Sequence, residues 1–363
     1  MKATIILEDG TELQGVSCGA DATSFGEIVF NTGMTGYQEI LTDPSYAGQI
    51  VVMTYPLIGN YGINEEDVES ARIHLRGFVI KELSDIESNW KSVKSLSEYL
   101  KENNIPCISG VDTRMLTKKI RAKGVMNCVI TTQDITGALG KQLKDSLKKQ
   151  LQEFKFPYDV VKQVSRKDVD VIKGNGKKIA LIDLGIKRGI IRHFVLLGCE
   201  ISIFPHDVSA QTILDGNFEA VLFSNGPGDP KEAKGAIETA KNLMGKLPLY
   251  GICLGHQILA LAIGADTYKL KFGHRGSNHP VIDLRTNKVM MTAQNHGYAV
   301  SSKKLPQDMQ ITHINVNDET VEGFCSPKFN INTVQFHPEA GPGPQDANYI
   351  FKDWVNALLC QSK

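Results

Sequence analysis

The chain has 363 residues, more than one hydrophobic core usually serves, so we expect two domains. Its hydrophobic content of 42% argues against disorder, and its 40 basic and 40 acidic residues cancel to a net charge of zero. A chain without excess positive charge has no general attraction for a nucleic acid or an anionic membrane, so we expect neither as a partner.

The seven cysteines are scattered along the chain and indicate a reducing compartment. None forms a Cys-x-x-Cys pair or lies at zinc-ligand spacing with a histidine. We therefore expect free thiols, no metal site and a cytoplasmic location. The first residues turn polar too early for a signal peptide, and no apolar stretch is long enough to span a bilayer.

The N-terminal part predicts short strands followed by two helices. Three apolar runs bounded by turn residues are candidate strands: 3–7, 28–30 and 50–53. Ser95 and Glu98 form a capping-box pattern before the first helix, and Asp112 can cap a second helix that ends at Gly124. These elements predict a mixed α/β domain over residues 1–150. From about 133 to 178 the chain is charged and weakly periodic, which favours a solvated linker, placed at residues 151–177.

Strands and helices alternate after residue 178. The candidate strands are 178–182, 201–204, 220–223 and 247–252. The candidate helices between and after them are 187–197, 233–244 and 254–263. This alternation predicts an α/β domain over residues 178–363, with a mostly parallel sheet flanked by helices. Beyond residue 265 the pattern is rich in strands, and it closes with a helix at about 346–359.

Cys253 occupies the most informative position in the chain. An apolar strand runs into a Gly-x-Cys-x-Gly motif at residues 251–255 and leaves it as an apolar helix. Such glycines permit a sharp turn that exposes the central side chain, the geometry of a nucleophile elbow. A thiol at a helix N-terminus is favoured as thiolate, and the N–H groups there can stabilise an oxyanion. The other six cysteines have no such setting, so we predict Cys253 as a nucleophile.

His337 and Glu339 are the predicted base and its orienting partner. They follow the apolar run 331–336, and Pro338 between them should end that strand. Residues at i and i+2 of an extended chain project to the same side, so the carboxylate can hold the imidazole. Alone, His-Pro-Glu is more often a surface turn. Together with the cysteine elbow it favours a catalytic Cys–His–Glu site.

The segment 224–230 is rich in glycine and proline and follows a predicted strand. As a turn it needs no function, but its glycines also allow the backbone to approach a ligand closely. It lacks the lysine of a P-loop, and no complete Gly-x-Gly-x-x-Gly motif follows any strand. We therefore predict no nucleotide site of these kinds.

Together, segments 251–257, 224–230 and 337–339 resemble the class I, triad-type glutamine amidotransferases. This resemblance implies that Cys253 attacks the side-chain amide of L-glutamine, that ammonia leaves, and that water hydrolyses the thioester. It also implies a set of residues that bind glutamine or its oxyanion: Gly226, Gly228, Leu254, Gln257, Asn295, Gly297 and Tyr298. His256 and His296 flank the site in sequence, and we interpret both as structural.

Segments 31–39, 42–46, 55–60 and 271–280 are similar to the small subunits of carbamoyl-phosphate synthetases. This narrower resemblance implies that Ser45 reaches the glutamine. It also implies a large-subunit partner that carries ATP, magnesium and bicarbonate, with no cofactor in this chain. Gly189 and Gly341 depart from the family pattern, in which asparagine and serine are common at these positions. Whether the product serves arginine or pyrimidine synthesis stays open.

Three alternatives remain at this point. The chain could be the glutaminase component of another synthetase, such as anthranilate or GMP synthetase, although those relatives lack the preceding N-terminal domain. It could be an intracellular cysteine peptidase, which an assay with peptide substrates would separate from a glutaminase. It could also be an assembly subunit with an inactive site, but the intact set of Cys253, His337 and Glu339 speaks against that.

Overall fold

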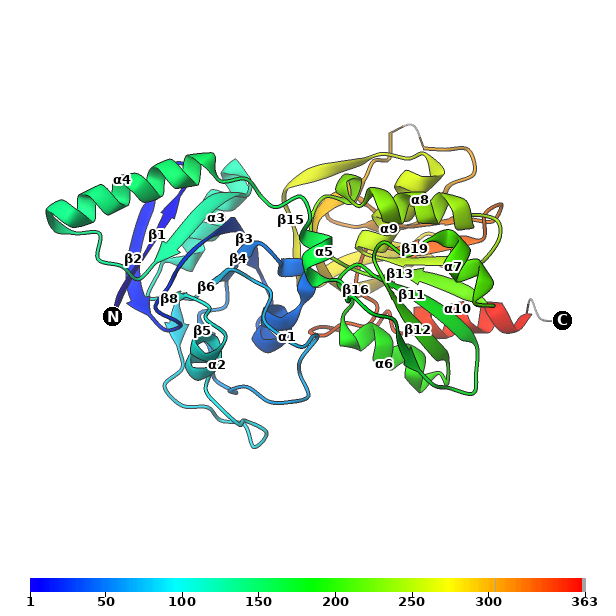
Figure 1. The fold of residues 1–363 in the computed structure, drawn as a ribbon, viewed down its shortest axis with the longest axis horizontal. Coiled ribbons are helices and arrows are strands. Elements are labelled where there is room, and N and C mark those ends of the chain that lie inside the picture. Colours follow the sequence, from blue (N-terminus) through cyan, green and yellow to red (C-terminus); the bar gives the residue numbers. More distant parts are fainter. Residues whose placement is uncertain (304, 361–363) are drawn as a thin grey trace. The chain divides into compact units, whose positions relative to one another are not determined.

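The computed structural model describes residues 1–303 and 305–360 and divides into two compact units, Met1–Pro157 and Tyr158–Lys363 (Figure 1). The boundary between the units falls within the predicted linker. No helix among the described residues combines the length and apolar character that crossing a membrane requires.

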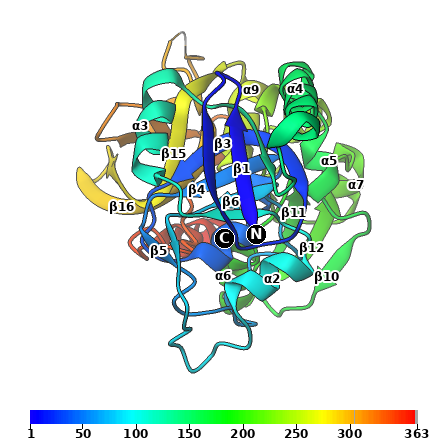
Figure 2. The same ribbon diagram turned by 90° about the vertical axis from the view of Figure 1, so that its left-hand side faces the viewer.

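The N-terminal unit is built on a closed barrel of seven strands in the order β1-β2-β8-β6-β4-β3-β9. The barrel strands are β1 (Lys2–Leu7), β2 (Glu12–Ser17), β3 (Thr23–Asn31), β4 (Gln49–Met53), β6 (Gly77–Val79), β8 (Cys107–Ser109) and β9 (Met126–Thr131). β5 (Leu57–Ile58) and β7 (Glu82–Leu83) form a separate short pair. Val29, Val51 and Phe78 of the barrel strands are fully buried in the core of the unit. Figure 2 shows the barrel strands β1, β3, β4 and β6.

The two predicted helices of this unit, α2 and α3, begin at their predicted caps, whereas α1, η1 and α4 were not predicted. They are α1 (Tyr37–Thr42), the short 3-10 helix η1 (Pro44–Tyr46), α2 (Leu96–Glu102), α3 (Thr113–Lys123) and α4 (Gly137–Glu153). The capping box of α2 is formed, with Glu98 N–H donating to Ser95 Oγ at 3.1 Å and Ser95 N–H donating to Glu98 Oε2 at 2.9 Å. Asp112 caps α3, which ends at Gly124 in a positive-φ conformation of 104°.

The structure differs from the predicted solvated linker. Helix α4 buries Leu147 and Leu151 against Ile6 and Val129 of the barrel. Farther along, α5 (Val160–Val164) is part of the C-terminal unit, and β10 (Asp170–Ile172) pairs antiparallel with β12 of the same unit. The leucines of α4 lie four residues apart and form an apolar stripe along one side of the helix, which packs on the barrel. Because many lysines stand between them, the sequence reads as a charged linker.

The C-terminal unit contains a ten-stranded sheet in the order β10-β12-β11-β13-β14-β19-β18-β16-β15-β17. The remaining strands are β11 (Lys178–Asp183), β12 (Glu200–Pro205), β13 (Ala220–Phe223), β14 (Leu249–Ile252), β15 (Thr267–Asp283), β16 (Lys288–Val300), β17 (Gln310–Asn315), β18 (Val321–Ser326) and β19 (Ile331–Val334). The run from β12 to β19 is parallel, whereas β18, β16, β15 and β17 continue it antiparallel. The parallel sheet that the sequence predicts thus forms the centre of the ten-stranded sheet.

Helices cover both faces of this sheet (Figure 1). Helices α6 (Arg188–Leu196) and α10 (Tyr349–Cys360) pack on one face, where Phe194 and Phe351 share a buried core. Helices α7 (Ala210–Asp215), α8 (Lys234–Leu243) and α9 (Leu254–Ile263) pack on the other, and η2 (Pro230–Glu232) precedes α8. Both faces of the central strands are covered, which explains their nearly continuous apolar sequences.

Candidate active site

Cys253 lies on a sharp turn between β14 and α9, with φ of 53° and ψ of −102°. A side chain on either flanking glycine would collide with backbone. A Cβ at Gly255 would lie 2.0 Å from the carbonyl oxygen of Phe223, and one at Gly251 would lie 2.7 Å from the Gly255 carbonyl carbon. The Gly-x-Cys-x-Gly spacing therefore permits close packing around a strained residue, as the elbow interpretation predicted.

His337 leaves the sheet beside Cys253. Strands β14 and β19 are parallel neighbours with Ile252 opposite Val334, so both residues follow the carboxyl ends of adjacent strands. Nδ1 of His337 lies 2.6 Å from Oε1 of Glu339, and the three side chains are buried. The predicted i, i+2 pairing is thus present. The Cys253 thiol points toward the carbonyl oxygen of Asn295, with an Sγ–O distance of 3.6 Å.

Lys187 places a buried positive charge beside Glu339. Its Nζ lies 3.0 Å from Glu339 Oε1 and donates a hydrogen bond to the Ala340 carbonyl oxygen at 2.7 Å. The sequence offered no signal for this role, because lysine is usually exposed. Its side chain is only 3% exposed.

Charge within the site shifts the pKa values of His337 and Glu339 in opposite directions. Burial favours the neutral form of each group, but the Lys187 ammonium and the His337 imidazolium outweigh it and lower the pKa of Glu339 to about 2. Burial and the Lys187 charge lower the pKa of His337, but the Glu339 carboxylate and the hydrogen bond with the Cys253 thiol outweigh them and raise it to about 10. The site therefore favours an imidazolium beside the thiol, the arrangement that activates a cysteine nucleophile.

The segment 224–229 lies against the start of α9. Ser224 accepts a hydrogen bond from Gly255 N–H through its carbonyl oxygen, and its hydroxyl accepts one from Leu184 N–H, both at 3.0 Å. A Cβ at Gly226 would lie 2.1 Å from the Leu184 carbonyl oxygen. Gly228 has φ of +91°, where a side chain would be strained. The glycines thus hold this loop close to the end of β11 and to the elbow.

Several predicted glutamine-binding residues lie on strand β16 and the neighbouring helix α9. Asn295, Gly297 and Tyr298 belong to β16, and Leu254 is the first residue of α9. Gln257 Nε2 donates to the Tyr298 carbonyl oxygen and to Gln335 Oε1, both at 2.8 Å. These contacts tie helix α9 to strand β16 beside Cys253.

Ser45 belongs to the N-terminal unit. It lies in η1, where its N–H donates to Asp43 Oδ1 at 2.8 Å.

The two flanking histidines have structural partners. His256 is fully buried, and its Nδ1 lies 2.8 Å from Thr333 Oγ1. Burial lowers the pKa of His256 to about 3, so its ring is neutral at physiological pH. His296 lies between the Tyr298 carbonyl oxygen and Gln294 Oε1, each 2.7 Å from a ring nitrogen. Neither histidine pairs with Cys253.

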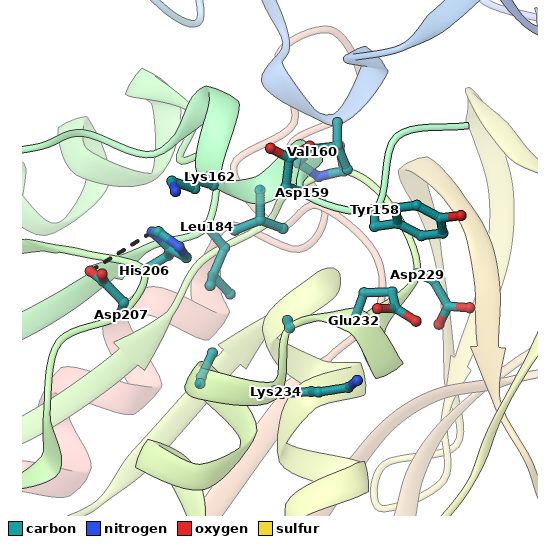
Figure 3. A pocket seen from close by; sticks show the side chains of 15 residues that line it. Tyr158, Asp159, Val160, Lys162, Leu184, His206, Asp207, Asp229, Glu232 and Lys234 are labelled. Atoms are coloured by element: carbon teal, nitrogen blue, oxygen red, sulfur yellow. Dashed lines mark ion pairs between the residues drawn. The ribbon is translucent and has the colours of Figure 1, made fainter. Parts of the chain in front are cut away.

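A cavity of about 410 Å³ lies beyond the carboxyl ends of β11, β12 and β13 (Figure 3). Its lining includes Leu184, His206 and Asp229, and His206 Nδ1 lies 3.9 Å from Asp207 Oδ1. Cys253, His337 and Glu339 are not among its lining residues. This cavity is lined instead by residues of the 224–229 loop and its neighbours, among them Asp229 and Leu184.

Comparison with known proteins identifies the family. The model of the carbamoyl-phosphate synthase small chain, CPSase domain, matches residues 5–130, and that of class-I glutamine amidotransferases matches residues 180–357. The carbamoyl phosphate synthase pyrimidine-specific small chain of Bacillus subtilis is 48% identical over 100% of this chain and 98% of that protein. The chain belongs to the carbamoyl phosphate synthase small chain family. As a member, it is a glutamine amidotransferase subunit.

A second small chain agrees with this assignment. The carbamoyl phosphate synthase small chain of Clostridium acetobutylicum is 49% identical over 98% of this chain and 100% of that protein. A glutamine amidotransferase of known structure from Thermotoga maritima is 18% identical, covers 52% of this chain and 86% of its own, and has a TM-score of 0.37. The match over residues 5–130 adds a small-chain domain outside the segment that the class-I amidotransferase model covers.

Proposed function

We propose that this small chain releases ammonia from L-glutamine with Cys253 as nucleophile, His337 as general acid and base, and Glu339 as the orienting carboxylate. One observation carries the proposal. The strained elbow of Cys253 and the His337–Glu339 pair leave the carboxyl ends of adjacent parallel strands, with 2.6 Å between imidazole and carboxylate. This is the nucleophile, base and orienter arrangement of covalent amide hydrolysis.

The proposed reaction has two halves. The Cys253 thiolate attacks the side-chain carbonyl carbon of glutamine, and the oxyanion that forms is stabilised by the N–H groups of Leu254 and Gly226. The His337 imidazolium donates its proton to the leaving nitrogen, the C–N bond breaks, and ammonia and a thioester result. Neutral His337 then takes a proton from water, which attacks the thioester. Glutamate leaves, and the thiolate–imidazolium pair is restored.

The remaining predicted residues would hold the substrate. A hydrogen bond of 2.8 Å links Gln257 to the backbone of Tyr298, which supports a shared role in holding the substrate. Asn295 and Gly297 lie on the same strand and would grip the amino-acid end. Gly228 and Ser45 complete the set that the family resemblance implies.

We further propose that the ammonia is consumed by a large chain that makes carbamoyl phosphate from bicarbonate and ATP. Family membership supports this, because the relatives are named as small chains of that synthase. ATP, magnesium and bicarbonate would bind to the large chain, with no cofactor on this one. A small chain that hydrolysed glutamine alone would waste it, so we expect the partner to stimulate hydrolysis.

The test compares wild type with Cys253→Ser, each assembled with the large chain of the synthase. Cys325→Ser serves as a control, because this partly exposed thiol lies outside the site. We expect Cys253→Ser to lose glutamine-dependent synthesis by at least about a thousandfold, as removal of a triad nucleophile does. Synthesis from added ammonia should persist in all three proteins. Glutamine-dependent synthesis by Cys253→Ser at the wild-type rate would refute the proposal.

A further inference from the structure

Three potential metal ligands from three strands meet next to the glutamine site. His274 of β15, His296 of β16 and Glu322 of β18 each offer one atom, and these atoms lie within 4.8 Å of one another. His274 Nδ1 is 3.6 Å and His296 Nε2 is 4.0 Å from Glu322 Oε1. The three side chains are 9%, 2% and 0% exposed, in the order His274, His296, Glu322. Glu322 Oε1 also accepts from Asn315 Nδ2 at 3.3 Å and from Thr320 Oγ1 at 3.4 Å. A carboxylate this deeply buried further needs a positive charge beside it, and either a protonated His274 or a metal ion can supply that charge.

Each imidazole has an inner nitrogen near Glu322 (His274 Nδ1, His296 Nε2) and an outer nitrogen on the other side of the ring. Hydrogen bonds at the outer nitrogens orient both rings. His274 Nε2 lies 2.8 Å from Asp318 Oδ2, and His296 Nδ1 lies 2.7 Å from the Tyr298 carbonyl oxygen. Because an ionised carboxylate and a backbone carbonyl only accept, each ring donates its outer N–H. The inner nitrogens then face Glu322. Metal-binding histidines are held in this way, with the second nitrogen bonded to a carboxylate or a backbone carbonyl.

The inner nitrogens lack suitable donors among the described residues. His274 Nδ1 is buried without a hydrogen-bond partner. Gln294 Nε2 donates to Glu322 Oε2 at 2.9 Å, so Gln294 turns its oxygen toward His296 Nε2, 2.7 Å away. In neutral His296 that nitrogen is an acceptor, so two acceptors face each other. Once His274 gives up the proton of its inner nitrogen, the cluster presents lone pairs and a negative charge to one point.

We propose that His274, His296 and Glu322 bind a divalent transition-metal ion of the zinc class. Two imidazole nitrogens and a carboxylate oxygen are a common zinc ligand set, with bonds of about 2.0–2.2 Å. The separations of 3.6 and 4.0 Å need only a small contraction to reach such bonds. Gln294 Oε1 or a water would fill the fourth position. Two carboxylates, Glu322 and Asp318, lie beside His274, and the one fixed cation that acts on His296 is Arg275.

Such an ion would tie together β15, β16 and β18 next to the residues proposed to bind glutamine. His296 donates to the same Tyr298 carbonyl oxygen that receives Gln257, and Asn295 and Gly297 adjoin His296. We therefore expect the ion to stiffen β16 against β15 and β18. The sequence pattern predicted no metal site, because the three ligands come from separate strands and lack a recognisable spacing. This inference does not depend on the proposed hydrolysis of glutamine.

Cobalt provides the first test, because tetrahedral Co²⁺ absorbs visible light. We expect the metal-stripped full-length chain to bind one Co²⁺ per chain with tetrahedral d–d bands, and added Zn²⁺ to displace it. Glu322→Gln and His274→Gln should each weaken binding at least about a hundredfold, whereas the matched control His206→Gln should bind as wild type. Absence of Co²⁺ uptake by wild type would overturn the proposal and leave a proton as the occupant. Equal uptake by wild type and Glu322→Gln would overturn it as well.

A crystallographic test keeps the proposal falsifiable if the variants fail to fold. Crystals of the wild-type chain are soaked in Zn²⁺, and anomalous differences are recorded at the zinc edge. We expect a peak bounded by His274 Nδ1, His296 Nε2 and Glu322 Oε1. Zinc peaks only elsewhere on the chain, or none, would overturn the assignment. Because neither test measures glutamine hydrolysis, its failure leaves the proposed function intact.

Discussion

Lys187 Nζ lies 3.0 Å from Oε1 of Glu339, and both side chains are buried. The same carboxylate oxygen lies 2.6 Å from His337 Nδ1. Glu339 is therefore shared between a fixed cation and the imidazole that faces Cys253. Since Lys187 also donates to the Ala340 carbonyl oxygen, it holds the turn that carries Glu339 as well as its charge.

Replacing Lys187 by Met should destabilise the chain and impair glutamine hydrolysis. Removing one partner of a buried ion pair leaves an uncompensated charge and costs about 3–5 kcal/mol. Because Glu339 then orients His337 less firmly, we expect kcat/KM for glutamine to fall at least about tenfold. Urea denaturation and hydrolysis assays check this, with Arg188→Met, a change at the exposed neighbour, as control. Equal behaviour of the two variants would contradict a role for the buried pair.

Replacing Glu339 by Gln should lower the pKa of His337 from about 10 to below its ordinary value of about 6.5. The carboxylate raises that pKa, whereas burial and Lys187, which remain, both lower it. Titration of the histidine ring resonances by NMR checks this. Asp229→Asn, which changes a carboxylate that lines the 410 Å³ cavity and does not act on His337, should leave the His337 titration unchanged.

The same shift predicts how stability depends on pH. The pKa of His337 is higher in the folded chain than in the unfolded one, so the folded state binds this proton more tightly. Its stabilising contribution is complete below about pH 6.5 and is lost as the pH rises through about 10. Unfolding free energies measured across that range should fall in wild type and fall less in Glu339→Gln. Identical slopes for both proteins would contradict the charge assignment.

Two glycine substitutions should separate the elbow from an ordinary helix position. Gly255→Ala would place a Cβ 2.0 Å from the Phe223 carbonyl oxygen, so we expect it to destabilise the chain by about 3 kcal/mol or more and to abolish hydrolysis. Gly235→Ala, in helix α8, meets no atom within 4 Å and should be neutral or stabilising by up to about 1 kcal/mol. Thermal unfolding and activity measurements check both. Full activity in Gly255→Ala would show that the elbow tolerates a side chain.

Substitutions at two histidines should distinguish the base from a core residue. His337→Asn should lower kcat by about a thousandfold or more, because the thiol loses its proton partner. His256→Asn removes a buried neutral ring bonded to Thr333, so we expect lower stability and a change in kcat of less than about tenfold. Steady-state kinetics with glutamine check both variants. A larger loss in His256→Asn, with the fold intact by circular dichroism, would reverse the two assignments.

Local patterns in the sequence predict much of the fold. Helix α9 has its predicted bounds, 254–263, and α2 and α3 begin at their predicted caps. These features depend on neighbours a few residues apart, so they are visible in the chain itself. Charge obscured α4, and the predicted linker proved to contain α5 and β10, because their packing partners lie far away in the sequence.

The sequence by itself determined the cysteine elbow and the His337–Glu339 pair. In both, the geometry follows from residues within a few positions of one another, where glycine permits the turn and a two-residue spacing in an extended chain aligns the side chains. The tertiary structure alone decided that His337 emerges beside Cys253, that Lys187 neutralises Glu339, and that His274 and His296 face Glu322. Strand order and burial bring these groups together, and burial makes unpaired charge costly. Neither property can be read from local spacing.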